Sequence, residues 1–358
     1  MCRFVNFQLE LTYGIRNRHR AGFFYIYMKK YLKKINRGES LSVEETNGVL
    51  EHIFSGDATD AQIGSYLSVT SRNGETIEDV VTTAEFINKR KMFVSGLSNA
   101  LDIVGTGGDS YDTINVSTLA SLVCAAFGVP IAKHGTRALS SKCGSFDVLN
   151  ELKVILPGNA MEAEAIFKQK NIVFLFAPNF HPLLKKIHHV RQEIGIRTIF
   201  NLVGPILNPG DVAYQVIGVS KSDIAEKVGA IALSLGRKRV LVMHGRDGLD
   251  EASVGALTDV YDFAPDRKMD HFVIEPDKRY AISEIQGGTP AENAIRFKNI
   301  VLGQGTQAEN EFVAINAGLG LYAVGRAQSP KDGRDMALDM LKSGEVEKIL
   351  KKITKTSL

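Results

Sequence analysis

From residue 29 onwards, the apolar positions of the chain recur with the period of amphipathic helices. The spacing predicts short helices over residues 29–37, 43–55, 59–72 and 77–91. Ser42 with Glu45 fits a capping box at the start of the second helix, and Thr76 with Asp79 resembles one at the start of the fourth. We therefore expect a small all-helical domain over residues 28–98.

After residue 98, short β-branched runs alternate with helical patterns. The predicted strands cover residues 101–104, 129–133, 172–176, 212–219, 239–243, 258–263 and 271–275. The predicted helices cover residues 117–127, 145–152, 159–170, 221–236, 290–302, 310–324 and 331–342. Such alternation is typical of parallel strands joined by helical crossovers. The expected fold class is α/β, with a mostly parallel central sheet flanked by helices in the larger domain.

The composition agrees with a globular protein and excludes several other classes. Hydrophobic residues make up 44% of the chain and charged residues 23%, which is ordinary for a large buried core. No apolar run approaches the roughly 20 residues that a membrane span requires. The three cysteines show no CxxC spacing, which favours a reducing cytoplasm over a disulfide framework. We expect a cytoplasmic protein with no membrane partner.

The small positive excess of the chain, a net charge of +3, lies in one segment. Residues 1–27 hold four arginines and a single acid, Glu10, so the remaining residues are neutral overall. No global field then attracts nucleic acid, and we expect none as a partner. The aromatic-rich residues 1–27 follow neither helical nor alternating order, and we interpret them as a dispensable leader, with Met28 as the natural start.

The segment Gly-Thr-Gly-Gly-Asp-Ser, residues 105–110, directly follows the first predicted strand. Ligands of open α/β sheets bind beyond such strand ends, and glycines let the backbone approach them closely. Residues 113–118, Thr-Ile-Asn-Val-Ser-Thr, then precede an apolar helix whose N-terminal amide groups suit an anion. Together they predict a phosphate site. The alternative is a glycine turn followed by a Ser or Thr helix cap.

Residues 133–145 follow the second predicted strand and combine Lys133, Arg137 and Lys142 with three serines and no acid. Cations and hydroxyls on one loop suit a polyphosphate. The alternative is a solvated basic loop. His134 could act as an acid or base, although an ordinary hydrogen-bonded histidine is the simpler interpretation.

A third segment contains His181, His188 and His189 and continues to Thr198. We expect no metal site there, because no paired cysteine or HExxH motif accompanies the histidines. Arg191 in the same segment suits bidentate binding of a carboxylate. The alternative for Arg191 is a surface ion pair, for example with Glu193.

Residues 244–251, His-Gly-Arg-Asp-Gly-Leu-Asp-Glu, follow the strand predicted over 239–243. Hard cations such as Mg²⁺ prefer oxygen ligands, often one or two carboxylates together with substrate phosphates. Asp250 and Glu251 suit such a site, provided that a phosphate site lies opposite. On its own, the run is more typical of an acidic turn.

In combination, these segments resemble the anthranilate phosphoribosyltransferase family, which is related to the pyrimidine nucleoside phosphorylases. The resemblance covers residues 28–358. It rests on GTGGD, NVST and the KHG-R-LSSK-GS pattern, and most specifically on RQEIGIRTIFNLVGPILNP (residues 191–209) and HGRDGLDE. It implies that a later segment, about residues 187–203, joins the helical domain. Residues 99–186 and 204–358 then form the α/β domain that binds 5-phosphoribosyl 1-diphosphate.

The resemblance implies a transferase reaction of the tryptophan pathway, its second step from chorismate. The amino group of anthranilate attacks C1 of the ribose in 5-phosphoribosyl 1-diphosphate, pyrophosphate leaves with the help of Mg²⁺, and N-(5-phosphoribosyl)anthranilate forms. A pair of Mg²⁺ ions per subunit and a homodimer are also implied. No general base is assigned, because an aromatic amine is already a neutral nucleophile.

Residue roles follow from the resemblance by position. The residues expected to bind the diphosphate donor are Gly105, Gly108, Asp109, Thr113, Asn115, Val116, Ser117, Thr118, Lys133, His134, Gly135, Thr136, Arg137, Ala138, Leu139, Ser140, Ser141 and Ser145. Those expected to meet anthranilate are Gly105, Thr136 and Arg191. Those expected to bind Mg²⁺ are Ser117, Asp250 and Glu251.

The sequence departs from the family pattern at two positions. Thr136 stands where the family has Asn, and it lacks the paired donor and acceptor of an amide. Cys143 stands where the family usually has Ser. Thr136 therefore leaves the identity of the acceptor more open than Cys143 does.

Three rival interpretations stay open on the sequence alone, and one of them, a scaffold role, is contradicted by no sequence feature. A pyrimidine nucleoside phosphorylase would use inorganic phosphate as the nucleophile and a nucleobase as the leaving group. A non-catalytic paralogue that binds polyanions should lose its acidic residues and gain a basic stripe. The chain keeps Asp250 and Glu251 and is neutral from residue 28 onwards, which favours the transferase.

Deletion of residues 1–27 tests the leader hypothesis. A chain starting at Met28 should keep the melting temperature and specific activity of the full chain within error, because no motif of the resemblance lies in the deleted segment. Thermal denaturation and an activity assay of both chains measure this, and loss of solubility or activity would refute the hypothesis.

Overall fold

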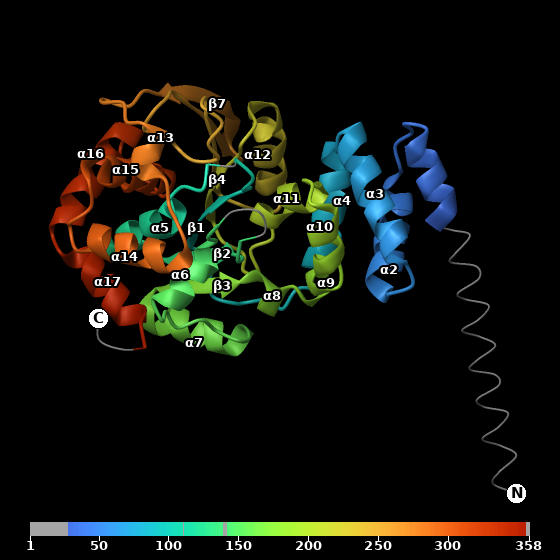
Figure 1. The fold of residues 1–358 in the computed structure, drawn as a ribbon, viewed down its shortest axis with the longest axis horizontal. Coiled ribbons are helices and arrows are strands. Elements are labelled where there is room, and N and C mark those ends of the chain that lie inside the picture. The colour runs from blue at the N-terminus through green and yellow to red at the C-terminus, as the bar shows by residue number, and fades with distance from the viewer. Residues whose placement is uncertain (1–27, 110, 139–141, 356–358) are drawn as a thin grey trace, which may run out of the picture. The chain divides into compact units, whose positions relative to one another are not determined.

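The computed structural model describes residues 28–109, 111–138 and 142–355. The expected leader and the expected donor-binding residues Leu139, Ser140 and Ser141 lie outside the described residues. The chain divides into two compact units (Figure 1). The first consists of residues up to Lys89 together with Leu183–Phe200, and the second consists of Arg90–Pro182 and Asn201–Leu358.

The first unit is helical, as the amphipathic pattern predicts. It contains a helix over residues 28–36, α2 (Val43–Ser55), α3 (Asp60–Asn73), α4 (Ile77–Asn88) and α10 (His188–Ile194). The short α9 (Pro182–Lys185) and α11 (Ile199–Val203) lie at the unit boundaries. Both predicted capping boxes are formed, Ser42 with Glu45 and Thr76 with Asp79. Each satisfies two amide groups that a helix start otherwise leaves without partners.

The second unit contains one seven-stranded sheet in the order β3-β2-β1-β4-β5-β6-β7. Its strands are β1 (Leu101–Gly105), β2 (Ile131–Gly135), β3 (Ile172–Phe176), β4 (Tyr214–Gly218), β5 (Arg239–Gly245), β6 (Thr258–Ala264) and β7 (Arg267–Ile274). The pairings from β3 to β5 are parallel, whereas β6 and β7 are antiparallel. This confirms the expected α/β class with a mostly parallel sheet.

Helices lie on both faces of this sheet, some in contact with the strands and others packed on those helices. They are α5 (Val116–Ala126), α6 (Ser145–Glu151), α7 (Ala160–Lys170), α8 (Ala177–Phe180), α12 (Ala225–Ser234), α13 (Ile282–Ile285), α14 (Pro290–Val301), α15 (Gln307–Ala323), α16 (Pro330–Lys342) and α17 (Glu345–Ile353), with 3₁₀ turns at Gly204–Ile206 and Ser222–Ile224. In β3, Ile172 and Phe174 belong to the larger core, whereas Val173 and Leu175 belong to a smaller core on the other face. Burial on both faces explains why these strands are apolar throughout rather than alternating.

Several elements of the structure are absent from the predicted set or have other bounds, among them α13 and the following. Four short helices, α8 to α11, occupy residues 177–203, where the sequence pattern predicts no helix or strand. Helix α17 follows α16 after the left-handed Gly344, and its Val346, Leu350 and Ile353 are buried. Strand β7 begins at Arg267 rather than at 271, because its first residues are exposed and carry no apolar signal.

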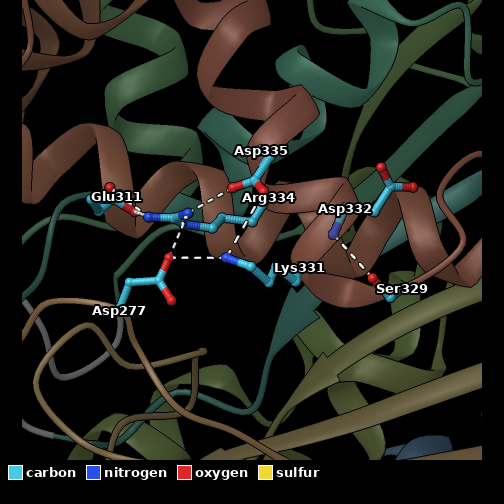
Figure 2. Close-up of polar contacts among 7 residues, drawn as sticks. All are labelled: Asp277, Glu311, Ser329, Lys331, Asp332, Arg334 and Asp335. Carbon is cyan, nitrogen blue, oxygen red and sulfur yellow. Dashed lines mark hydrogen bonds and ion pairs between the residues drawn. The ribbon is translucent and has the colours of Figure 1, made fainter.

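A group of charged residues joins α15, α16 and the segment after β7 (Figure 2). Arg334 contacts Glu311 at 2.7 Å and Asp277 at 3.0 Å, and Lys331 contacts Asp277 at 3.1 Å. A cavity of about 250 Å³ lies beside them, with Phe272 among its apolar lining residues. Because these charges pair with one another, their main effect is to fasten the segment after β7 to the two helices.

Within the described part of the chain, no helix combines the length and the apolar character needed to cross a membrane.

Two glycines let α15 and α16 pack against each other. A Cβ atom on Gly318 would lie 2.5 Å from the backbone nitrogen of Arg334, and one on Gly333 would lie 2.5 Å from the carbonyl oxygen of Gly318. Both distances are too short for a real contact. The atoms that a Cβ would meet belong to the backbone, so they could give way only if the two helices moved apart.

Gly318→Ala should therefore lower the free energy of unfolding by about 2 kcal/mol, the usual size of an overpacking cost. Gly64→Ala in α3 is the matched control, because its Cβ would make ordinary contacts at 3.6 and 3.9 Å. The control should be neutral or stabilising by up to about 1 kcal/mol, as alanine is the better helix former. Equal stabilities of the two variants in urea denaturation would contradict the close packing.

Candidate active site

The glycine segment after β1 contacts the acidic segment after β5. The amide of Thr106 donates to the carbonyl of Gly218 at 2.9 Å, and the amide of Gly107 donates to Oδ2 of Asp250 at 2.5 Å. A Cβ on Gly218 would overlap the carbonyl oxygen of Asp250. Only glycine permits this approach, and it brings two of the predicted segments together at the carboxyl ends of β1, β4 and β5.

Three carboxylates converge where these segments meet. Asp109, Asp250 and Glu251 offer oxygens that all lie within 4.8 Å of one another. Burial raises the pKa of Glu251 well above its usual range, and the neighbouring Asp250 and Asp109 raise it further. A divalent cation would remove this repulsion, and an all-oxygen donor set suits Mg²⁺. The resemblance assigns Asp109 to the diphosphate donor, and its place beside Asp250 emerges only from the fold.

Hydrogen bonds tie the acidic segment to residues 111–113. The hydroxyl of Thr113 donates to Oε2 of Glu251 at 3.1 Å, and the hydroxyl of Tyr111 donates to the carbonyl of Asp247 at 2.7 Å. The first bond lowers the pKa of Glu251 and so opposes the effect of burial. Thr113 thus supports the charged form of this carboxylate.

Lys133 is buried in β2 rather than exposed on a loop, with 2% of its surface accessible. Its Nζ donates to the hydroxyl of Ser117 at 3.1 Å and to the carbonyl of Ile103 at 2.5 Å. Burial lowers the pKa of Lys133 to about 8, while the nearby carboxylates of Asp102, Glu251 and Asp250 oppose that shift. The interpretation of a solvated basic loop is therefore wrong for this lysine, which brings positive charge to Ser117.

Asp102 on β1 has a fully buried carboxylate, and it belongs to none of the predicted motifs. It accepts from the amide of His134 at 3.1 Å, from Nδ2 of Asn208 at 2.9 Å and from Nε2 of Gln215 at 3.3 Å. Burial raises its pKa, whereas Lys133 and these donors favour its charged form. The Asp102 carboxylate thus links His134, near the end of β2, to Asn208 through hydrogen bonds. An acidic residue within an otherwise apolar strand is the signal that could have revealed it.

The start of α5 does not have the Ser or Thr cap that was the alternative to a phosphate site. Its cap is Asn115, whose side chain makes no capping hydrogen bond. Instead, the Asn115 side chain donates to the carbonyl of Cys143 at 3.2 Å and accepts from Nδ2 of Asn293 at 3.2 Å. The alternative of a hydroxyl cap is therefore wrong, and Val116, Ser117 and Thr118 form the first turn of a helix with no acidic residue there.

Unlike Lys133, the cations Arg137 and Lys142 of segment 133–145 are exposed, as the alternative of a solvated loop predicts, and each lies near one carboxylate. Arg137 lies 3.9 Å from Asp147, and Lys142 lies 3.9 Å from Asp112. The hydroxyl of Ser145 donates to the carbonyl of Thr136 at 3.4 Å. Gly135 ends β2. The amide of Ala138 donates to the same Asp147 carboxylate. The side chain of Thr136 itself is exposed.

Two buried histidines lie behind this segment. The rings of His134 and His181 are 5.3 Å apart, and Nε2 of His181 lies 2.7 Å from the carbonyl of Leu207. Burial lowers the pKa of both, to about 4 for His181, so both are neutral at pH 7. Nε2 of His134 has no hydrogen-bond partner among the described residues, unlike the ordinary hydrogen-bonded histidine considered above. Neither ring carries charge to the site.

Arg191 belongs to the first unit, on α10. Its guanidinium lies 5.6 Å from the centre of the Phe200 ring, and burial lowers its pKa. Among the residues that the structure describes, no carboxylate pairs with it, so the alternative of an ion pair with Glu193 is wrong. His189 instead contacts Asp60 at 3.0 Å, and no histidine of the described residues joins a cluster suited to a metal ion.

Comparison with known proteins agrees with this architecture. Residues 29–89 match the helical bundle domain of a glycosyl transferase family, and residues 97–347 match the a/b domain of that family. The anthranilate phosphoribosyltransferase of Endomicrobium trichonymphae is 39% identical over 90% of this chain and 96% of its own length.

Solved structures give the same result. The anthranilate phosphoribosyltransferase of Thermus thermophilus is 34% identical, with a TM-score of 0.82 over 90% of this chain and 97% of its own. The enzyme from Saccharomyces cerevisiae, solved in complex with PRPP and Mg, is 25% identical, with a TM-score of 0.83 over 91% and 96% of the two chains. On the matched domains and this near full-length likeness, the chain belongs to the anthranilate phosphoribosyltransferase family of glycosyl transferases.

Proposed function

We propose how this chain performs the reaction of its family, the transfer of the 5-phosphoribosyl group from 5-phosphoribosyl 1-diphosphate to the amino group of anthranilate. The observation that carries the proposal is the convergence of Asp109, Asp250 and Glu251 on the glycine segment after β1. A pyrophosphate leaving group and its metal ion need this pairing of acidic and phosphate-binding segments.

The acidic residues hold Mg²⁺ in this proposal. Asp250 and Glu251 supply carboxylate oxygens, Asp109 adds a third, and Ser117 on α5 adds its hydroxyl. When bound, Mg²⁺ neutralises the charge that develops on the departing pyrophosphate. Thr113 keeps Glu251 oriented through its hydrogen bond of 3.1 Å.

The donor is held by backbone amides and by Lys133. The segment after β1 and the first turn of α5 present N–H groups, which suit phosphate oxygens at a helix start. Lys133 adds a buried positive charge beside Ser117. These are the residues that the resemblance assigns to the donor, and Gly105 and Thr136 with Arg191 are those assigned to anthranilate.

Recognition of anthranilate falls to Arg191 in this proposal. Its guanidinium stacks on Phe200 and pairs with no carboxylate among the described residues, so it is preorganised to bind the anthranilate carboxylate. No side chain is needed as a general base, because the amine is a neutral nucleophile. His134 and His181 are neutral and contribute no charge. Positioning of the two substrates then supplies much of the rate.

The rival functions are weaker on the same observations. A nucleoside phosphorylase has no pyrophosphate leaving group to explain three converging carboxylates, and these carboxylates would repel a polyanion that binds without a metal ion. Measurement of uridine or thymidine phosphorolysis separates the first rival. The homodimer, the pair of Mg²⁺ ions, the cytoplasmic location and the domain boundaries inferred from the resemblance stay predictions.

Glu251→Gln tests the metal site. Without Mg²⁺ the variant should melt at a higher temperature than the parent, because it removes one of three repelling carboxylates. The combined stabilisation by Mg²⁺ and the diphosphate donor, read by thermal shift, should be lost, and activity should fall about 100-fold or more. Asp270→Asn, on the exposed strand β7, is the control and should behave as the parent does. A Glu251→Gln variant that keeps the ligand-induced shift would contradict the assignment.

Arg191→Ala tests the carboxylate site. The variant should raise the anthranilate KM by roughly 100-fold, as expected when a charged hydrogen-bond partner is removed, and change the donor KM by no more than about threefold. Lys185→Ala, an exposed cation of the same unit, is the control. Steady-state kinetics with each substrate varied in turn give the two constants. Equal increases in both would count against the role of Arg191.

A further inference from the structure

A segment outside every predicted binding motif, residues 285–288, runs alongside residues 112–114. The amide of Ile114 donates to the carbonyl of Ile285 at 3.0 Å, and the amide of Gly287 donates to the carbonyl of Asp112 at 2.7 Å. Thr113 and Gln286 form an isolated antiparallel bridge. The backbone that carries Thr113 is thus paired with segment 285–288 on one side.

Asn293, in the first turns of α14, connects this segment to the start of α5. Its side chain is 3% exposed. Its Oδ1 accepts from the amide of Gly288 at 2.7 Å, and its Nδ2 donates to Oδ1 of Asn115 at 3.2 Å. A Cβ on Gly287 would lie 2.7 Å from Asn293 Oδ1, so this glycine allows the close fit.

The orientation of both amide groups follows from these bonds. The amide of Gly288 can only donate, so the oxygen of Asn293 must face it and its NH₂ group must face Asn115. The oxygen of Asn115 therefore accepts the hydrogen bond from Asn293. The NH₂ group of Asn115 then donates to the carbonyl of Cys143, 3.2 Å away. A series of hydrogen bonds therefore links Gly288, Asn293, Asn115 and Cys143 across three segments of the polypeptide. The orientation of each amide in this series is fixed by the bond before it.

Helix α14, which carries Asn293, is itself well anchored in the fold. Its start is closed by a capping box of Thr289 and Glu292, and its Ala294 and Phe297 are buried in the main core. Asn293 is therefore fixed by the fold, whereas Asn115 and Cys143 lie in the segments that the proposed function assigns to the donor.

We propose that Asn293 is a positioning residue for the phosphoribosyl-diphosphate site: it orients Asn115 and, through it, the segment at Cys143. Asn293 acts through Asn115, and its side chain also interacts with the Cys143 thiol, whose pKa it lowers against the effect of burial. Asn293 does not touch the donor. This inference rests on the proposed function for its kinetic consequence, while the support of residue 143 is independent of it.

The first experiment reads the support directly, without substrate. Cys143 is 8% exposed and Cys124 is fully buried, so both thiols should react slowly. In a Cys2→Ser background, Asn293→Ala should speed the labelling of Cys143 by a thiol reagent about tenfold, the size expected for loss of one buried hydrogen bond, with Cys124 unchanged. Equal acceleration of both thiols would indicate general loosening and overturn the proposal, as would no acceleration.

The second experiment reads the kinetic consequence. Asn293→Ala should raise the donor KM about tenfold, with the anthranilate KM and kcat within about twofold. If this variant fails to fold, Asn293→Asp serves instead, since it keeps the acceptor for Gly288 and loses the donor to Asn115. Asn299→Ala and Asn299→Asp, exposed on the same helix, are the matched controls.

A double-mutant cycle decides whether the effect passes through Asn115. If it does, Asn293→Ala combined with Asn115→Ala should raise the donor KM no more than Asn115→Ala alone. Additive effects, or a folded Asn293 variant with an unchanged donor KM, would overturn the proposal. Failure of the proposed function would look different, because the unmodified chain would then show no donor-dependent turnover while the labelling result still held.

Discussion

The structure of the site depends on the close approach of Asp250 to the ends of β1 and β4. The carbonyl of Asp250 occupies the space where Gly218 would carry a Cβ, and its carboxylate lies against Gly105 while accepting from the amide of Gly107. Any larger residue at these strand ends would push the acidic segment away. Because Gly105 and Gly218 carry no side chains, the cluster of carboxylates can lie beside the backbone that is proposed to bind phosphate.

That approach has an electrostatic cost, which the surrounding residues reduce. Burial, and then repulsion by Asp250 and Asp109, raise the pKa of Glu251. The buried charge of Lys133 and the hydroxyl of Thr113 offset part of the repulsion. Lys133 in turn lies near the buried Asp102, which is held by Asn208 and Gln215. The site therefore favours binding of a cation, and its supports extend well behind the ligand-facing residues.

The sequence predicts much of this architecture because the relevant signals are local. Capping boxes at Ser42 and Thr76 and the apolar strands follow from residues near one another in the chain, as do the motifs at strand ends. Long-range contacts have no such signal. The place of Asp109 beside Asp250, the burial of Lys133 and the role of Asn293 beside Asn115 each depend on residues more than 100 positions apart or on how strands pack. The α8 to α11 helices are too short for periodicity to reveal.

The loss of anthranilate fluorescence tests the central claim most directly, that the acidic and glycine segments together serve a magnesium-dependent phosphoribosyl transfer. Anthranilate is fluorescent, so its consumption can be followed with and without Mg²⁺ and 5-phosphoribosyl 1-diphosphate. The account predicts loss of fluorescence only when both are present. A folded protein that binds both substrates and leaves the fluorescence unchanged, or consumes anthranilate equally fast without Mg²⁺, would contradict it.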